Sequence, residues 1–173
     1  MKTQLLSLGI IVMLAFLVGC SGSQQKKLEE ITRLETSLLD PERVSIDMQT
    51  ATQLISSYIA YVEEFPSDPQ SPVYLFKAGE LSMNINQGSQ ALQYLEQLRN
   101  TYPDFEKMAE VIFIEAFIYE SMMNNTEKAR EFFEMFVERY PEHELYQDAS
   151  VSLRNLGKTL EEIVEEFEKL NAQ

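Results

Sequence analysis

The sequence contains very few of the residues on which metal sites and nucleophilic active sites depend. Its 173 residues include one cysteine, one histidine and no tryptophan. A single cysteine cannot form an internal disulfide, and Cys20 with His143 cannot complete a zinc site. The same scarcity argues against a Ser-His-Asp or Cys-His triad, because His143 would have to serve it alone. We therefore expect no catalytic triad, no metal and no cofactor.

Basic residues, glycine and proline are also scarce. The chain has 14 Lys and Arg against 28 Asp and Glu, for a formal net charge of −14. A surface this acidic repels the phosphate backbone, so we expect no nucleic-acid partner. Glycine and proline number six each, too few for a loop-rich all-β protein. The length suits one domain or one short repeat array. The composition favours an acidic, mostly helical protein that is not an enzyme.

The beginning of the sequence has the pattern of a targeting segment. Lys2 precedes an uncharged run of fourteen residues from Leu5 to Val18. Fourteen helical residues rise only about 21 Å, which is short of the roughly 30 Å hydrocarbon core. The length therefore predicts a signal peptide over residues 1–19 rather than a transmembrane anchor.

The end of that segment, Leu17-Val18-Gly19-Cys20, resembles a bacterial lipobox. The resemblance implies that Cys20 becomes the mature N-terminus and carries acyl chains such as palmitate, each buried CH₂ contributing about 0.8 kcal/mol to anchoring. Ser21 follows, with no acidic run after it, which is similar to lipoproteins kept on the periplasmic face of the outer membrane. We expect residues 20–26 to be the lipidated cysteine and a flexible tether.

An internal repeat fills most of the remaining chain, residues 27–173. Apolar residues recur there at three- and four-residue spacing, which predicts helices almost throughout. Residues 74–103 align with residues 112–141 at an offset of 38 without a gap, and a weaker copy lies 37 residues earlier. A period in the high thirties with two helices per period is typical of a helical-hairpin solenoid. The aligned pairs include Ala78 with Ala116, Asn86 with Asn124, Ala91 with Ala129, and Phe65-Pro66 with Tyr102-Pro103 and Tyr140-Pro141.

These residues give the pattern of a known repeat. Small side chains stand where closely crossing helices need them, and a proline ends each hairpin. The pattern resembles the tetratricopeptide repeat (TPR), which implies an all-α, right-handed superhelical solenoid. We expect about three hairpins and a C-terminal capping helix whose apolar residues face inward: Leu160, Ile163, Val164, Phe167 and Leu170. The Tyr-Pro endings are similar to repeats of the outer-membrane β-barrel assembly lipoprotein and of the Tol-Pal coordinator.

The resemblance also implies where a partner binds. In stacked hairpins of this family the first helix of each pair lines a concave groove. The residues that we expect to reach a ligand are Phe76, Glu80, Met83, Ile114 and Ile118. A carboxylate at Glu80 among apolar groups should select a peptide that carries Lys or Arg. A rotation of one residue decides which of these side chains are core instead.

We therefore expect a lipid-anchored interaction scaffold that presents its groove to an envelope protein or peptide, with outer-membrane assembly as one role. The alternative is a carboxylate enzyme, or accessory subunit, that acts on the cell wall. Such an enzyme needs two carboxyl groups facing each other at about 5–10 Å. Glu115 and Glu120 have apolar neighbours, but they are five residues apart, so they point about 140° apart on a helix. His143 is interpreted as a helix-entry residue.

Overall fold

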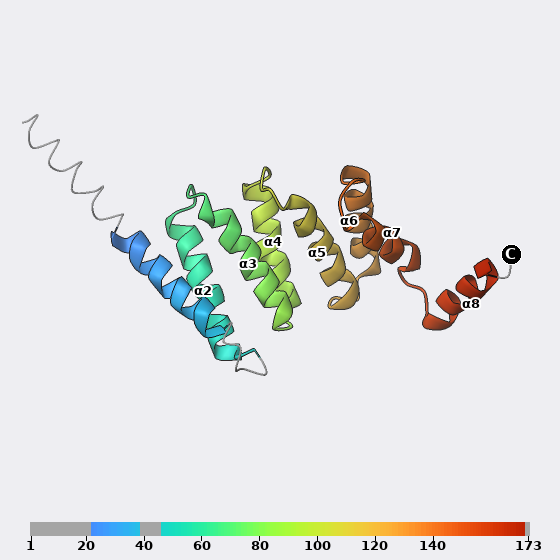
Figure 1. Ribbon diagram of the computed structural model, residues 1–173, viewed down its shortest axis with the longest axis horizontal. Helices are drawn as coiled ribbons and strands as arrows, with labels where there is room; N and C mark the ends of the chain where they lie inside the picture. The colour runs from blue at the N-terminus through green and yellow to red at the C-terminus, as the bar shows by residue number, and fades with distance from the viewer. Residues whose placement is uncertain (1–21, 39–45, 172–173) are drawn as a thin grey trace, which may run out of the picture. The chain divides into compact units, whose positions relative to one another are not determined.

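The computed structural model describes residues 22–38 and 46–171, and the regular elements in this part of the chain are all α-helices. This confirms the all-α prediction. The signal peptide and Cys20 lie outside the described residues. The chain divides into two compact units, Met1–Leu81 and Ser82–Gln173, which are described separately. A helix over residues 22–38 is followed by α2 (Met48–Glu64), α3 (Gln70–Asn84), α4 (Gly88–Thr101), α5 (Met108–Ser121), α6 (Thr126–Arg139), α7 (Tyr146–Asn155) and α8 (Leu160–Asn171) (Figure 1).

Three helices end in the same way, at the aromatic residue before a proline. Phe65, Tyr102 and Tyr140 have φ/ψ of −126°/54°, −129°/62° and −127°/54°, outside the helical region. A residue before proline avoids the α conformation, so each helix stops there. Each of the three residues still donates its N–H to the carbonyl four residues earlier, at 2.8–2.9 Å. The repeat found in the sequence is therefore also a repeat of backbone conformation.

The turns inside the hairpins repeat as well. Asn86 has φ 62° and Asn124 has φ 49°, and they are the described non-glycine residues with positive φ. Asparagine adopts this left-handed region more readily than most residues because its short polar side chain can bond locally. Both lie at the junction between two helices, as the sequence alignment predicts.

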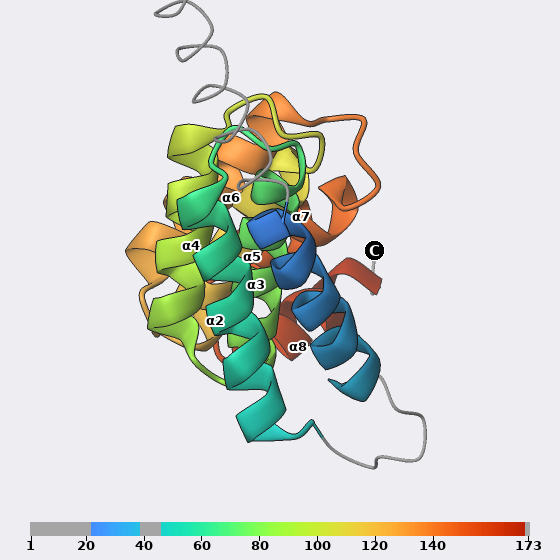
Figure 2. The same ribbon diagram turned by 90° about the vertical axis from the view of Figure 1, so that its left-hand side faces the viewer.

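In the first unit, the helix over residues 22–38 lies along α2 (Figure 2). Gln24 donates its side-chain N–H to the Tyr61 hydroxyl and to Asp68, both at 2.7 Å. Lys27 pairs with Glu64 at 3.3 Å. The flexible tether predicted for residues 20–26 is therefore wrong for residues 22–26, which are helical. Side-chain contacts with α2 order this polar stretch, and composition alone could not predict them.

A polar cluster around Glu35 joins three helices of the first unit. Tyr58 and Lys77 both donate to Glu35 Oε1 at 2.7 Å, so the 22–38 helix, α2 and α3 meet at one carboxylate. Tyr58 stacks on Tyr74 with ring centroids 5.1 Å apart. Burial opposes ionisation of Glu35, but the hydrogen bonds from Lys77 and Tyr58 prevail and hold its pKa below the ordinary value. The ionised carboxylate thereby links three helices.

In the second unit, α4, α5, α6 and α7 pack on one another in chain order. The side chains of Ala91, Ala116, Ala129 and Ala149 are fully buried, as expected for residues at helix crossings. Phenylalanines fill the space beside them: the Phe113 ring meets Phe133 and Phe136 edge-on, with centroids 5.8 and 5.6 Å apart. The small residues predicted at the helix crossings and the phenylalanines beside them thus form the core of this unit.

The last helix differs from the expectation. α8 exists, but Leu160 is 77% exposed and Val164 is 54% exposed, so the predicted inward packing is wrong for these two residues. Gly157, with φ 81°, redirects the chain between α7 and α8. The side chains of Phe167 and Leu170 lie outside the described part. Among residues 22–38 and 46–171, we find no helix long and apolar enough to cross a membrane.

Candidate functional site

The five predicted groove residues divide into core and surface. Phe76 is 6% exposed and Ile118 is fully buried, so both belong to the core of their units and the prediction that they reach a ligand is wrong. Glu80, Met83 and Ile114 are half-buried and accessible from solvent. Phe76 and Glu80 lie in the first unit, whereas Met83, Ile114 and Ile118 lie in the second.

The accessible face of α5 is centred on Ile114 and Phe117. Phe117 is 44% exposed, which is unusual for a large aromatic side chain in a helix whose neighbouring residues Ala116 and Ile118 are fully buried. Ile114 and Phe117 are three positions apart and so share one face of the helix. The sequence predicted that Ile114 and Ile118 share the accessible face of this helix. In the structure that face is shifted by one residue, so it carries Ile114 and Phe117 instead.

The ends of this face are polar. Glu110 and Ser121 continue the spacing of three and four residues on either side of Ile114 and Phe117. Glu110 Oε2 lies 3.7 Å from Nε2 of His143, in the loop before α7. The Leu145 N–H donates to His143 Nδ1 at 3.2 Å, which leaves Nε2 as the protonated nitrogen that faces Glu110. His143 thus lies in the loop at the entry to α7, as predicted, with its Nε2 close to the Glu110 carboxylate beside the apolar stripe.

Glu115 lies on the opposite, buried side of α5. It is 1% exposed and accepts two bonds from Arg99 of α4, at 3.0 Å from Nε and 3.5 Å from Nη2. The Arg99 guanidinium also lies over the Phe132 ring of α6, 5.4 Å from its centroid. The sequence indicated Glu115 as a carboxylate with apolar neighbours, but gave no sign of Arg99, which is 16 residues away on another helix.

This arrangement does not match the carboxylate pair of a cell-wall enzyme. Burial raises the pKa of Glu115 to about 7, although the hydrogen bond and charge of Arg99 act to lower it. Burial also raises the pKa of Glu120. However, both oxygens of Glu115 are directed to Arg99 within the core, whereas an acid catalyst must face its substrate. The pair Arg99–Glu115 joins α4 to α5 rather than forming an open site.

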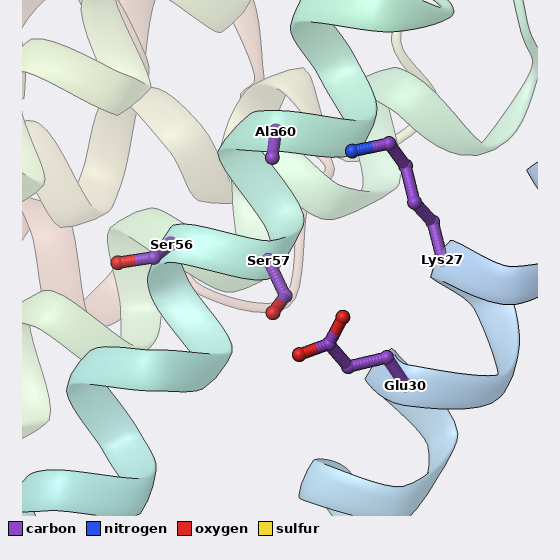
Figure 3. Close-up of a pocket in the computed structure, with 5 residues that line it drawn as sticks. All are labelled: Lys27, Glu30, Ser56, Ser57 and Ala60. Atoms are coloured by element: carbon purple, nitrogen blue, oxygen red, sulfur yellow. The ribbon is translucent and has the colours of Figure 1, made fainter. Parts of the chain in front are cut away.

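A pocket of about 250 Å³ lies in the first unit, between the 22–38 helix and α2 (Figure 3). Its lining consists of Lys27 and Glu30 on one side and Ser56, Ser57 and Ala60 on the other. Figure 3 shows the Glu30 carboxylate pointing toward Ser57. Ligand pockets are generally larger than this one. This one exists because short side chains of α2 face the helix, and α5 remains the stronger candidate for partner binding.

Comparison with known families agrees with the geometry. Residues 74–104 and 110–143 match the Tetratricopeptide repeat family. Two tetratricopeptide repeats thus lie within residues 74–143. No curated protein matches the chain. Within residues 22–38 and 46–171, histidine, cysteine and carboxylate side chains form no group that could hold a metal ion. TPR units serve as scaffolds for protein-protein interaction rather than as catalytic folds, so the exposed face of α5 is a candidate site for a partner protein.

Proposed function

We propose that this chain is a lipid-anchored scaffold of the bacterial cell envelope that binds a partner protein through the exposed face of α5. The observation that carries the proposal is the exposure of Phe117 next to half-buried Ile114 within a TPR unit. An exposed aromatic side chain beside a branched aliphatic one is a typical anchor for a partner. A binding role needs only a rigid surface, which the packed helices α4 to α7 provide.

The charges around this face suggest the chemistry of the partner. Glu110 lies at one end of the stripe, and the half-buried Glu120 lies near the other. The whole chain has a net charge of −14. A partner segment with apolar side chains and Lys or Arg beside them fits such a surface better than an acidic one. We propose a peptide or exposed segment of another envelope protein with this composition.

The lipid anchor is the second part of the proposal and rests on the sequence. Leu17-Val18-Gly19-Cys20 ends an uncharged run of signal-peptide length. Ser21 and the absence of an acidic run after the cysteine favour the periplasmic face of the outer membrane. On this proposal the scaffold holds its partner at that membrane, and outer-membrane assembly is one process that needs such a component.

Site-specific photocrosslinking in intact envelopes tests the binding face. A photoreactive residue at position 117 should give a discrete adduct, whereas one at Glu138, exposed on α6, should not. An adduct at position 117 should weaken when Ile114 is changed to Ser, because the neighbouring part of the face is lost. Equal crosslinking at both positions, or none at 117, would contradict the proposed face.

A further inference from the structure

The C-terminal helix α8 carries a second exposed apolar surface, separate from α5. Leu160 is 77% exposed and Val164 is 54% exposed, and half-buried Ile163 lies between them in the sequence. These residues are three and four positions apart, so they form one stripe on the helix. A soluble helix normally buries such a stripe. We call this set of three residues the α8 stripe.

Local signals specify where α8 begins, independently of packing. The Thr159 N–H donates to Glu162 Oε2 at 2.8 Å, and the Glu162 N–H donates to Thr159 Oγ1 at 3.3 Å. This reciprocal pair is a capping box, which fixes the first turn of a helix. Acidic residues stand in the first turn and Lys169 in the last, as the helix dipole favours. The helix is therefore encoded, although a helix of 12 residues is marginal in water until its apolar face is covered.

The polar side of α8 is strongly acidic. Residues 160–171 contain five glutamates and one lysine. Glu161 and Glu168 are seven positions apart and so lie on the same flank of the α8 stripe, and both are exposed. The lysine, Lys169, is 3.3 Å from Glu165 on the same helix. A surface that covers the stripe will meet a carboxylate at its border.

These charges discriminate between possible occupants. An anionic lipid surface would be repelled by the glutamates. A second copy of this chain would bring one set of glutamates against another, which is unfavourable. A helix of 12 residues is only about 18 Å long, so any contact made through this stripe alone is small beside the roughly 800 Å² per partner of a stable interface. A basic amphipathic segment avoids both of the charge objections.

We propose that α8 is a docking helix for an amphipathic helix of another protein, with apolar residues that cover Leu160, Ile163 and Val164 and with Lys or Arg at its borders. The small contact area makes this contact a weak one that adds to binding elsewhere on the scaffold. The α8 stripe is independent of the α5 face, so either proposal can fail without the other.

Two synthetic helical peptides test the proposal against the purified full chain by fluorescence anisotropy. They share one apolar stripe and differ only in bordering residues, Lys in one and Glu in the other. We expect the Lys peptide to bind at least about tenfold more tightly, a difference of about 1.4 kcal/mol. The Leu160→Ser/Val164→Ser variant should lose about tenfold in affinity for the Lys peptide. Val151→Ser, at a 43% exposed position on α7, is the matched control and should bind like the parent.

Charge reversal provides a second test, in case the serine variant loses helix. Glu161→Lys/Glu168→Lys should invert the preference in favour of the Glu peptide. Glu165→Lys changes charge away from the stripe and should leave the preference as it was. Equal affinity for both peptides, or unchanged binding by both double variants, would overturn the proposal. Binding to anionic vesicles through the α8 stripe, or a concentration-dependent dimer abolished by Leu160→Ser/Val164→Ser, would overturn it in favour of lipid or self-association.

Discussion

Arg99 and Glu115 form a two-pronged ion pair between α4 and α5, with Nε to Oε2 at 3.0 Å and Nη2 to Oε1 at 3.5 Å. The carboxylate is 1% exposed, whereas the arginine retains partial access to solvent. An unpaired buried charge is costly, so the arginine makes an ionised glutamate tolerable at this point in the core.

The burial of Glu115 predicts that stability depends on pH. Its folded-state pKa is about 7, against 4.5 for the ordinary group. The folded protein therefore binds more protons than the unfolded chain between these two values, and the stabilisation present at low pH is lost as the pH rises through 7. The melting temperature should fall between pH 5 and pH 8. Glu115→Gln should flatten this part of the profile in thermal melts. A profile as steep as that of the parent would place the titrating group elsewhere.

Loss of Arg99 should be most harmful where Glu115 is ionised. Arg99→Met removes both hydrogen bonds and leaves a carboxylate buried without a partner, which typically costs about 3–5 kcal/mol. We expect the loss to be larger at pH 8 than at pH 5, where protonation relieves it, as measured by urea denaturation. The double variant Arg99→Met/Glu115→Leu should recover much of the stability. Equal losses at both pH values would contradict a role for the buried charge.

Ala129 should not tolerate a larger side chain. It is fully buried and packs with Phe132, Phe133 and Phe136 in the core of the second unit. Overpacking at such a site costs about 1–3 kcal/mol, so Ala129→Leu should lower the melting temperature by several degrees. Arg130→Leu, at the adjacent exposed position, is the control and should melt close to the parent. An Ala129→Leu protein as stable as the parent would show that the helices around residue 129 leave room for a larger side chain.

The positive φ of Asn124 gives a prediction at the turn between α5 and α6. At φ 49°, a β-branched residue is strained, whereas glycine is not. Asn124→Val should destabilise the protein by about 1–2 kcal/mol, and Asn124→Gly should leave it as stable as the parent or more so. Asn86, with φ 62°, occupies the equivalent turn, so Asn86→Val and Asn86→Gly should change the stability in the same directions. Chemical denaturation measures all four variants.

The proposed anchor predicts the behaviour of a single substitution. Cys20→Ala removes the residue that would carry lipid, so the protein should leave the membrane fraction and fail to incorporate labelled fatty acid. Ser21→Ala retains the cysteine and should remain anchored. Membrane association of Cys20→Ala equal to that of the parent would refute the lipobox interpretation.

Much of the fold follows from the sequence because the repeat places equivalent residues in equivalent surroundings. Tyr102-Pro103 and Tyr140-Pro141 predict the ends of α4 and α6, and Ala91 and Ala129 predict the buried crossings. These features are local, or they recur at a fixed offset, so one copy supports the other.

The rotation of α5 and the exposure of α8 could not be predicted in this way. Around α5 nearly every position is apolar, so spacing cannot tell that Ile118 is buried and Phe117 is exposed. In α8 the spacing of Leu160 and Val164 identifies an apolar face, but spacing alone cannot tell that the helices of the same chain leave these side chains exposed. Arg99 was missed for another reason: its partner Glu115 is on a different helix, and the repeat has no second copy of the pair, since Val137 stands at the aligned position.

The early start of the first described helix limits how far the scaffold can stand from an anchor. Residue 22 is already helical, two positions beyond Cys20, and two residues span at most about 7 Å when fully extended. With a lipid on Cys20, as proposed, only a very short linker would separate the first described helix from its anchor. Gln24 would hold the anchored helix against α2, through Tyr61, close to the bilayer. A partner that binds the first unit would then have to come to the membrane surface.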